Sequence, residues 1–254
     1  MFSSKRFSEQ FKILLYQNFY RHGMFLLIFI LAMIFLYYKT FQTGGPGDNI
    51  FKSFGFFVAI FGIIESIDVF SRLRSTGSGI FYLMLPATTF EKFLAALLYT
   101  TLFTFIVYLS TFYIIQFLVV NIGNMFVTTD VSLYFPDMKR ILDDLTDMLF
   151  FQSLYFLGST IFKKNPIGKT TAAIVGIIIL ISIVSGLVMK QYFSEYGIAV
   201  NNGSYNFNFD GDFNDNLILP DVFDNLKLIL EISFYVIPLL CWTGAFFKLK
   251  KTEI

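Results

Sequence analysis

The sequence predicts an all-α, polytopic membrane protein with six transmembrane helices and an N-terminal amphipathic helix at the membrane interface. Hydrophobic residues make up 56% of the 254 residues and charged residues only 15%, whereas a soluble domain carries roughly 25% charged residues. The mean hydropathy is +0.66. The charges also fall in clusters, and the longest stretch without Asp, Glu, Lys or Arg extends from Phe93 to Thr129.

The expected spans are segments apolar and long enough to cross a hydrocarbon core, which takes about 20 helical residues. A backbone in lipid has to satisfy its own hydrogen bonds, so these segments are expected to be helices. The expected spans are residues 23–41, 50–70, 92–121, 146–163, 170–190 and 228–248. They belong to one transmembrane domain that covers residues 23–254. An even number of spans places both termini on the same side of the membrane.

The distribution of charge predicts the orientation. With both termini in the cytoplasm, the inner segments hold 13 of the 19 Lys and Arg residues, and the outer segments hold 13 of the 18 Asp and Glu residues. Cytoplasmic loops carry an excess of Lys and Arg, so we expect the N-terminus and the C-terminus to be cytoplasmic. The lipid bilayer is the expected surrounding, and no nucleic-acid partner is expected.

Residues 1–22 are expected to form an amphipathic helix in the cytoplasmic interface, ahead of the first span. One face carries Phe7, Phe11, Leu14, Leu15 and Phe19, and the opposite face carries Lys12, Gln17 and Arg21. An ordinary positively charged flank of the first span is the alternative. His22, the only histidine, ends this segment. It has no partner at metal-ligand spacing, so we interpret it as an interfacial histidine rather than a metal ligand or a catalytic group.

The chain is interrupted between the second and third expected spans. Arg72 and Arg74 place this segment at the cytoplasmic face. The apolar block at residues 80–85 is too short to cross the membrane. Pro86 disfavours a helical conformation at the residue before it, so a preceding helix is expected to end there.

A new helix is expected to begin directly after this interruption. Thr88 fits the N-cap position, and Glu91 stands three residues later, as a capping box requires. The expected geometry is a short cytosolic helix, a rigid corner and a new transmembrane helix. Three uses fit the apolar block: it lies in the lipid interface, it folds under its own bundle, or it fills a groove on a partner protein.

The stretch YLMLPATTFEKFLAALL, which begins at Tyr82, resembles a segment of permease subunits of type-2 ATP-binding-cassette (ABC-2) exporters, in the version common in Bacteroidetes. The match is close over residues 82–94. The six-span plan, the amphipathic N-terminal helix and the cytoplasmic termini agree over most of the chain, whereas the outer loops match nothing evident. In that family the segment contacts the ATP-binding subunit. The resemblance therefore implies a coupling contact made by Arg72, Arg74, Ile80, Tyr82, Leu83, Met84, Leu85, Pro86, Thr88, Glu91 and Lys92.

The resemblance also implies partners and a location. A separate ATP-binding-cassette ATPase subunit would hold ATP and Mg, and a second permease copy or a homologue would complete the translocation pathway in a bacterial cytoplasmic membrane. This chain would hold no cofactor and no metal, and it would not be an enzyme. A non-transporting membrane scaffold or sensor is the alternative from another class. A secondary transporter is less favoured, because we see no internal repeat of the kind such folds contain.

Two loop motifs resemble ligand sites but are incomplete. Residues 165–171 end in Gly-Lys-Thr, yet Lys163 stands where a phosphate-binding loop needs its first glycine. Residues 206–217 resemble a calcium loop, but Leu217 stands where the closing Glu belongs. We interpret the first as a positively charged cytoplasmic turn and the second as a solvated acidic loop.

Acidic residues near the membrane are weighed as functional candidates. Residues 137–150 are expected to form an amphipathic helix that caps the bundle and leads into the fourth span. Glu65, Asp68 and Glu231 are the acidic residues within or beside spans, and all three lie near expected span ends. Asp68 and Arg72 are four residues apart, as an ion pair on one helical face requires. A solvated or paired role is therefore favoured over a proton relay.

Overall fold

The structure is a computed structural model that describes most of the chain. It describes residues 2–43, 48–70, 87–126, 131–162, 164–195, 200–201, 204–205 and 219–253. Outside these ranges lie the calcium-like loop at residues 206–217 and eight residues of the expected coupling contact. Those eight are Arg72, Arg74, Ile80, Tyr82, Leu83, Met84, Leu85 and Pro86.

The described chain is almost entirely helical, which confirms the all-α expectation. The helices are α1 (Ser4–Thr43), α2 (Asp48–Asp68), α4 (Thr89–Leu98), η2 (Tyr99–Phe103), α5 (Thr104–Phe126), α6 (Met138–Ile161), α7 (Pro166–Glu195) and α8 (Leu219–Glu253). The short strands β1 (Val200–Asn201) and β2 (Ser204–Tyr205) pair antiparallel.

Within the described residues, five helices are long and apolar enough to cross a membrane, as a polytopic helical membrane protein requires. They are Ser4–Thr43, Ile50–Asp68, Thr89–Phe126, Pro166–Leu187 and Glu231–Thr252. The fourth expected span, residues 146–163, falls in α6, which is not one of the five. The first half of α6 carries Lys139, Arg140 and three aspartates. It continues without a break into the second half, so the expected capping helix and the expected span are one helix.

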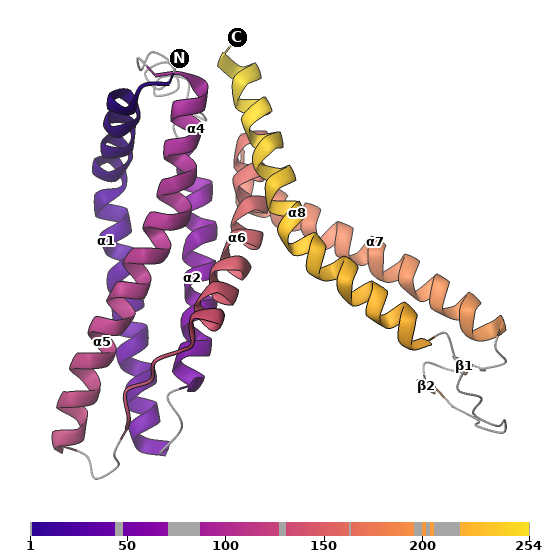
Figure 1. Cartoon of the computed structure of the whole chain (residues 1–254), viewed down its shortest axis with the longest axis horizontal. Coiled ribbons are helices and arrows are strands. Elements are labelled where there is room, and N and C mark those ends of the chain that lie inside the picture. The colour runs from indigo at the N-terminus through magenta and orange to yellow at the C-terminus, as the bar shows by residue number, and fades with distance from the viewer. Residues whose placement is uncertain are drawn as a thin grey trace. The chain divides into compact units, whose positions relative to one another are not determined.

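The chain divides into two compact units, residues 168–233 and the remainder of the chain. In the larger unit, α1, α2, α5 and α6 lie along one another, and both ends of the chain are at the same end of the unit (Figure 1). Leu14 of α1, Phe93 of α4 and Leu249 of α8 belong to one buried cluster at that end. The beginning of the first helix and the end of the last helix therefore pack together.

The first helix differs from the expected interfacial helix followed by a separate span. α1 is one helix of 40 residues, about 60 Å long at 1.5 Å per residue, which is about twice the hydrocarbon thickness. No proline interrupts it. Much of the face expected in the lipid interface packs on the protein instead, because Leu14 is buried and Phe7, Phe11 and Leu15 cover the same cluster. Phe19 is 78% exposed.

Aromatic side chains fill the core between α1, α2 and α5. The rings of Phe61 and Tyr108 stack with centroids 4.8 Å apart. Phe29 meets Tyr108 edge to face at 5.1 Å, and Phe54 meets Phe112 at 5.1 Å. Aromatic pairs at such distances contribute about 0.5–1.5 kcal/mol each beyond area burial. They join α1, α2 and α5 into one core.

Glycines bring α2 against α6. A Cβ atom at Gly55 would lie 2.7 Å from Asp144 Oδ1, and one at Gly62 would lie 3.0 Å from Met148 Cε. A larger residue at either position would therefore require the Asp144 or Met148 side chain to shift. Small residues are the usual means by which membrane helices approach closely, since apolar side chains gain little by leaving lipid for protein.

Asp144 is an acidic group at this close contact. Its Oδ2 atom is buried and has no hydrogen-bond partner among the described residues. Burial raises the pKa of Asp144 to about 6; Arg140 acts in the opposite direction, and the neighbouring Asp147 and Asp143 add to the rise. Asp144 precedes the fourth expected span and lies outside the five qualifying helices. Its protonated form therefore suits the packed helix pair better than its charged form.

Asp144 should make the folded state less stable as the pH rises. The pKa of Asp144 is 3.8 in the unfolded chain and about 6 in the folded protein. Its contribution to the free energy of unfolding is therefore fully present below pH 3.8 and is lost as the pH rises to about 6. We expect the detergent-solubilised protein to melt at a higher temperature at pH 5 than at pH 7, and Asp144→Asn to reduce this difference. Glu9→Gln, at an exposed carboxylate of α1, is the control. An Asp144→Asn profile parallel to that of the wild type would contradict the assignment.

Candidate functional site

The third membrane-crossing helix begins with the predicted capping box. Thr88 is the N-cap, and its hydroxyl accepts a hydrogen bond from the Glu91 amide at 3.3 Å. The Thr88 amide in turn donates to Glu91 Oε2 at 2.8 Å. Side chains thus satisfy two of the amides that lack an intrahelical partner at the start of α4, which fixes where the helix begins. The predicted capping box is confirmed.

The same carboxylate also binds the N-terminus of α1, which the sequence did not indicate. Glu91 Oε1 accepts a hydrogen bond from the Ser3 amide at 2.6 Å and another from Arg6 Nη2 at 3.0 Å. The Glu91 side chain is fully buried, whereas Arg6 is 42% exposed. Glu91 therefore joins the beginnings of α1 and α4. We call Ser3, Arg6, Thr88 and Glu91 the terminal clamp.

Three of the expected coupling residues lie within the described chain, and they have different surroundings. Thr88 is exposed, whereas Glu91 and Lys92 are 0% and 3% exposed. The two charged residues therefore serve internal contacts rather than an open surface. Glu91 and Lys92 lie in the first turn of α4, a few residues after the expected coupling segment ends at residue 86.

A second set of charged pairs joins α1 to α2. His22 Nδ1 lies 2.9 Å from Glu65 Oε1, and these side chains are 11% and 1% exposed. Arg21 and Asp68 form an ion pair of 3.0 Å and are partly exposed. These contacts support the paired role expected for Glu65 and Asp68. The interfacial interpretation of His22 is incomplete, because the histidine has a buried carboxylate partner.

Aromatic side chains surround the buried pair. The ring centroid of His22 lies 6.3 Å from that of Tyr99 and 5.7 Å from those of Phe103 and Tyr108. The other imidazole nitrogen, Nε2, and Glu65 Oε2 are both buried without a hydrogen-bond partner among the described residues. Ionisable residues inside membrane helices are functional candidates by default. The pair is thus a buried titratable site enclosed by aromatic rings.

The helix opposite His22 contains a π-helical turn, η2. Short π segments inside α-helices occur frequently at functional sites. The hydroxyls of Thr100 and Thr104 donate hydrogen bonds to backbone carbonyls of the same helix. Gln152 of α6 donates to Thr100 Oγ1 at 2.7 Å in a buried contact. The turn therefore presents Tyr99 and Phe103 to α1 and Thr100 to α6.

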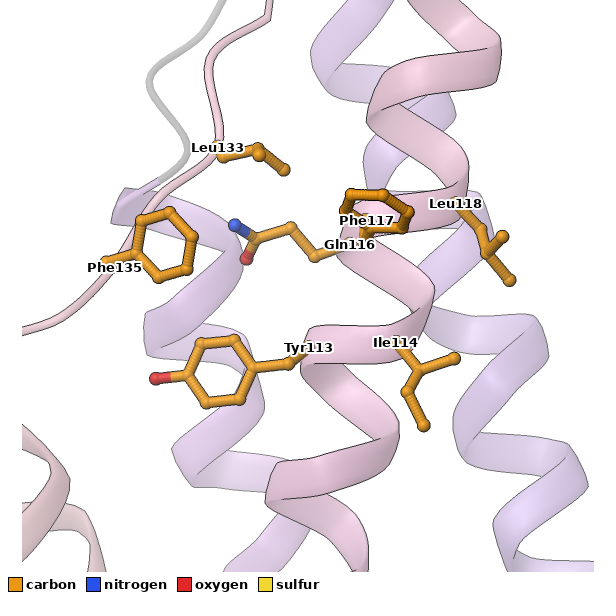
Figure 2. A pocket seen from close by; sticks show the side chains of 7 residues that line it. All are labelled: Tyr113, Ile114, Gln116, Phe117, Leu118, Leu133 and Phe135. Atoms are coloured by element: carbon orange, nitrogen blue, oxygen red, sulfur yellow. The ribbon is translucent and has the colours of Figure 1, made fainter.

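A pocket at the other end of the bundle lies between α5 and the extended segment after it. Figure 2 shows Tyr113 and Gln116 projecting from α5 towards Leu133 and Phe135. The pocket has a volume of about 400 Å³. Gln116 Nε2 donates to the carbonyl of Tyr134 at 2.9 Å and so holds the segment against α5. This contact satisfies a buried backbone group in a part of the chain without secondary structure.

Two other features bear on ligand chemistry. Gly168, Lys169 and Thr170 lie within the first turns of α7, which begins at Pro166. The last residues of a phosphate-binding loop also open a helix, so the departure from that pattern is Lys163 in the place of the first glycine. Among the described residues, no group of three His, Cys, Asp or Glu side chains is placed to hold a metal ion.

Breaking the terminal clamp should destabilise the bundle. Glu91→Gln removes the charge that holds Arg6 and the Ser3 amide, and a hydrogen bond to a charged group contributes about 1.5–3 kcal/mol. We expect a loss of about 2 kcal/mol in the free energy of unfolding, measured by denaturant titration in detergent. Glu9→Gln, at an exposed pair with Lys12, is the matched control and should cost about 0–1 kcal/mol. Equal losses in the two variants would contradict the clamp.

The His22–Glu65 pair should show strong energetic coupling. His22→Phe leaves a buried carboxylate without its partner, and Glu65→Leu leaves a buried imidazole without its acceptor, so each single change should cost about 3–5 kcal/mol. The double variant should recover much of this loss, giving a coupling energy above about 1 kcal/mol in a double-mutant cycle. A cycle on the exposed pair Glu9 and Lys12 serves as the comparison. Additive losses at His22 and Glu65 would show that the two side chains act independently.

No protein-family model, curated protein or solved structure matches this chain. Its functional features are therefore the ones given by its own geometry. They are the terminal clamp, the buried His22–Glu65 pair and the π-helical turn that faces it. All three belong to the larger unit.

Proposed function

We propose that this chain is the transmembrane permease subunit of an ATP-driven exporter, coupled to a separate ATP-binding subunit through residues 72–92. The proposal starts from the resemblance of residues 82–94 to the coupling segment of ABC-2 permeases. The apolar block at residues 80–85 would fill a groove on the partner. ATP and Mg would bind to that partner, and this chain would form the translocation pathway with a second permease copy or a homologue.

The terminal clamp is the structural observation that supports this proposal best. Thr88 and Glu91 fix the start of α4 directly after the expected coupling segment. The same Glu91 carboxylate holds Ser3 and Arg6 at the start of α1. A displacement of the segment would therefore move the ends of two membrane-crossing helices together. Rigid elements with discrete arrangements are the means by which one site changes the packing at another.

The π-helical turn gives such a displacement a place to act. α4, η2 and α5 follow one another without a break and form one continuous helix. A movement of its first residues, next to Thr88, would therefore also move Tyr99 and Thr100. Tyr99 contacts His22 of α1, and Thr100 accepts a hydrogen bond from Gln152 of α6. A π turn is a less regular part of a helix and is often used where a helix changes shape.

A secondary transporter is the second candidate, and the buried His22–Glu65 pair is the observation that favours it. Intramembrane histidines and carboxylates form proton relays in many transporters. The two candidates differ in what purifies with the chain. An exporter subunit should retain an ATP-binding protein, whereas a secondary transporter should be active alone. A scaffold or sensor would show neither ATP hydrolysis nor transport.

The coupling proposal predicts an outcome for one charged substitution. Leu83→Glu places a carboxylate in the apolar block, and burial of one large apolar side chain is worth roughly 1.5–3 kcal/mol. We expect the tagged wild-type chain, purified from its native membrane in mild detergent, to carry an ATP-hydrolysing subunit. Leu83→Glu should lose that subunit or its transport-coupled activity, while insertion in the membrane is unchanged.

Met84→Leu is the matched control, because it keeps the block apolar and of similar volume. It should retain the ATP-hydrolysing subunit at the wild-type level. If Leu83→Glu also retains the subunit and its full activity, the segment is an interfacial turn and the proposed coupling is wrong.

A further inference from the structure

A groove opens along α1 next to the buried pair. It has a volume of about 730 Å³, within the range of about 300–1,000 Å³ found for ligand pockets. α1 forms one side from Lys12 to Ile30, and Tyr99, Phe103 and Val107 form the other. Over this length α1 rises about 27 Å at 1.5 Å per residue. The groove is therefore long and narrow rather than round.

The lining changes from charged to apolar along the groove. Lys12 stands at one end and is the one Lys or Arg among the described lining residues. The residues beyond it are mostly aromatic or aliphatic, and the rim residues Tyr16, Phe19 and Leu27 are 82%, 78% and 56% exposed. No described part of the chain covers this rim. A ligand that fits has an anionic end and a long apolar body.

Gly23 creates the open space in the middle of the groove. A Cβ atom built on Gly23 would meet nothing within 4 Å, so the position does not need glycine for its own helix packing. Glycine weakens a helix interior relative to alanine. The groove at this point is thus open because the side chain is missing, and a larger side chain would fill it without displacing the bundle.

We propose that this groove binds one anionic phospholipid of the surrounding bilayer, with an acyl chain along α1 and the phosphate on Lys12. At about 27 Å the groove is long enough for an acyl chain that crosses one leaflet, about 15 Å of hydrocarbon, with further length for the headgroup. The Lys12 ammonium lies 3.8 Å from Glu9, and both side chains are 59% exposed. An exposed pair of this kind is weak, so the ammonium is available to a phosphate.

This proposal depends on insertion of α1 in a membrane and not on the exporter function. Anionic lipid would lie against His22, which lines the groove and pairs with Glu65 of α2. The bound lipid would act as a part of the folded bundle, because its acyl chain fills space that the described side chains leave open.

The experiment measures quenching of a tryptophan in the groove by lipids with brominated acyl chains. Trp242 is the only tryptophan, so Trp242→Phe supplies a silent background in the full-length chain. Leu27→Trp places the reporter on the groove, and Phe247→Trp, at a residue that is 67% exposed on α8, places a control outside it. Each variant is reconstituted in phosphatidylcholine vesicles with the same mole fraction of brominated phosphatidylglycerol or brominated phosphatidylcholine.

The groove reporter should prefer the anionic lipid. We expect a relative affinity of about fivefold for phosphatidylglycerol, the factor for one lysine at an anionic surface. Lys12→Gln should bring this factor close to one. The control reporter should be quenched equally by both lipids. Gly23→Leu should lower quenching at the groove reporter by either lipid, whereas Gly176→Leu, at a glycine on α7 that also has nothing within 4 Å of a built Cβ, should not.

Three results would overturn the proposal. Equal quenching by the two lipids at the groove reporter would show ordinary boundary lipid. No effect of Gly23→Leu would show that the lipid does not enter the groove. Quenching at the control reporter with none at the groove reporter would show that protein, such as a second copy of this chain, covers the groove.

Discussion

The position of α1 depends on two carboxylates that the bundle removes from water. Glu91 and Glu65 are 0% and 1% exposed, and a carboxylate in such a place needs charged or hydrogen-bonding partners. The first finds them in Ser3 and Arg6 and the second in His22. Arg6 and His22 lie about 24 Å apart along α1 at 1.5 Å per residue. Two fixed points at that separation set both the height and the rotation of the helix.

These pairs specify the arrangement more than they stabilise it. Replacing a buried ion pair with packed apolar side chains is often neutral or favourable, whereas removing one partner is costly. Apolar burial alone gives helices in lipid little reason to choose one neighbour over another. The choice of neighbour here comes from contacts with a definite geometry, such as Gly55 against Asp144 and Gln152 against Thr100. The aromatic core then fills the space that these contacts define.

Local patterns in the sequence predicted the helical class and the Thr88–Glu91 capping box, because hydropathy and the S/T-x-x-E motif are read within a few residues. The partners of Glu91 and Glu65 were not predictable in this way. Ser3 and Glu91 are 88 residues apart in the chain, and His22 and Glu65 are 43 apart. The boundary expected between residues 1–22 and the first span is not a break in the structure, since α1 continues through it as one α-helix. Of the residues expected in the coupling contact, the structure describes only Thr88, Glu91 and Lys92.

The outward faces of the helices show why this chain needs a surrounding that is itself apolar. In the most hydrophobic stretch of α7 only 6% of the residues are buried, and Ile178, Ile181 and Leu187 are more than half exposed. A helix that is apolar on all sides is stable in lipid or against another apolar partner, and not in water. α1 is different, because one face carries its charged anchors and another carries the open groove. Ion pairs hold one face of α1 against the bundle, and another face is open to an amphipathic ligand. The packing of the bundle is therefore linked to the occupant of the groove. The structural role of α1 and its candidate binding role thus lie on one helix, and His22 takes part in both.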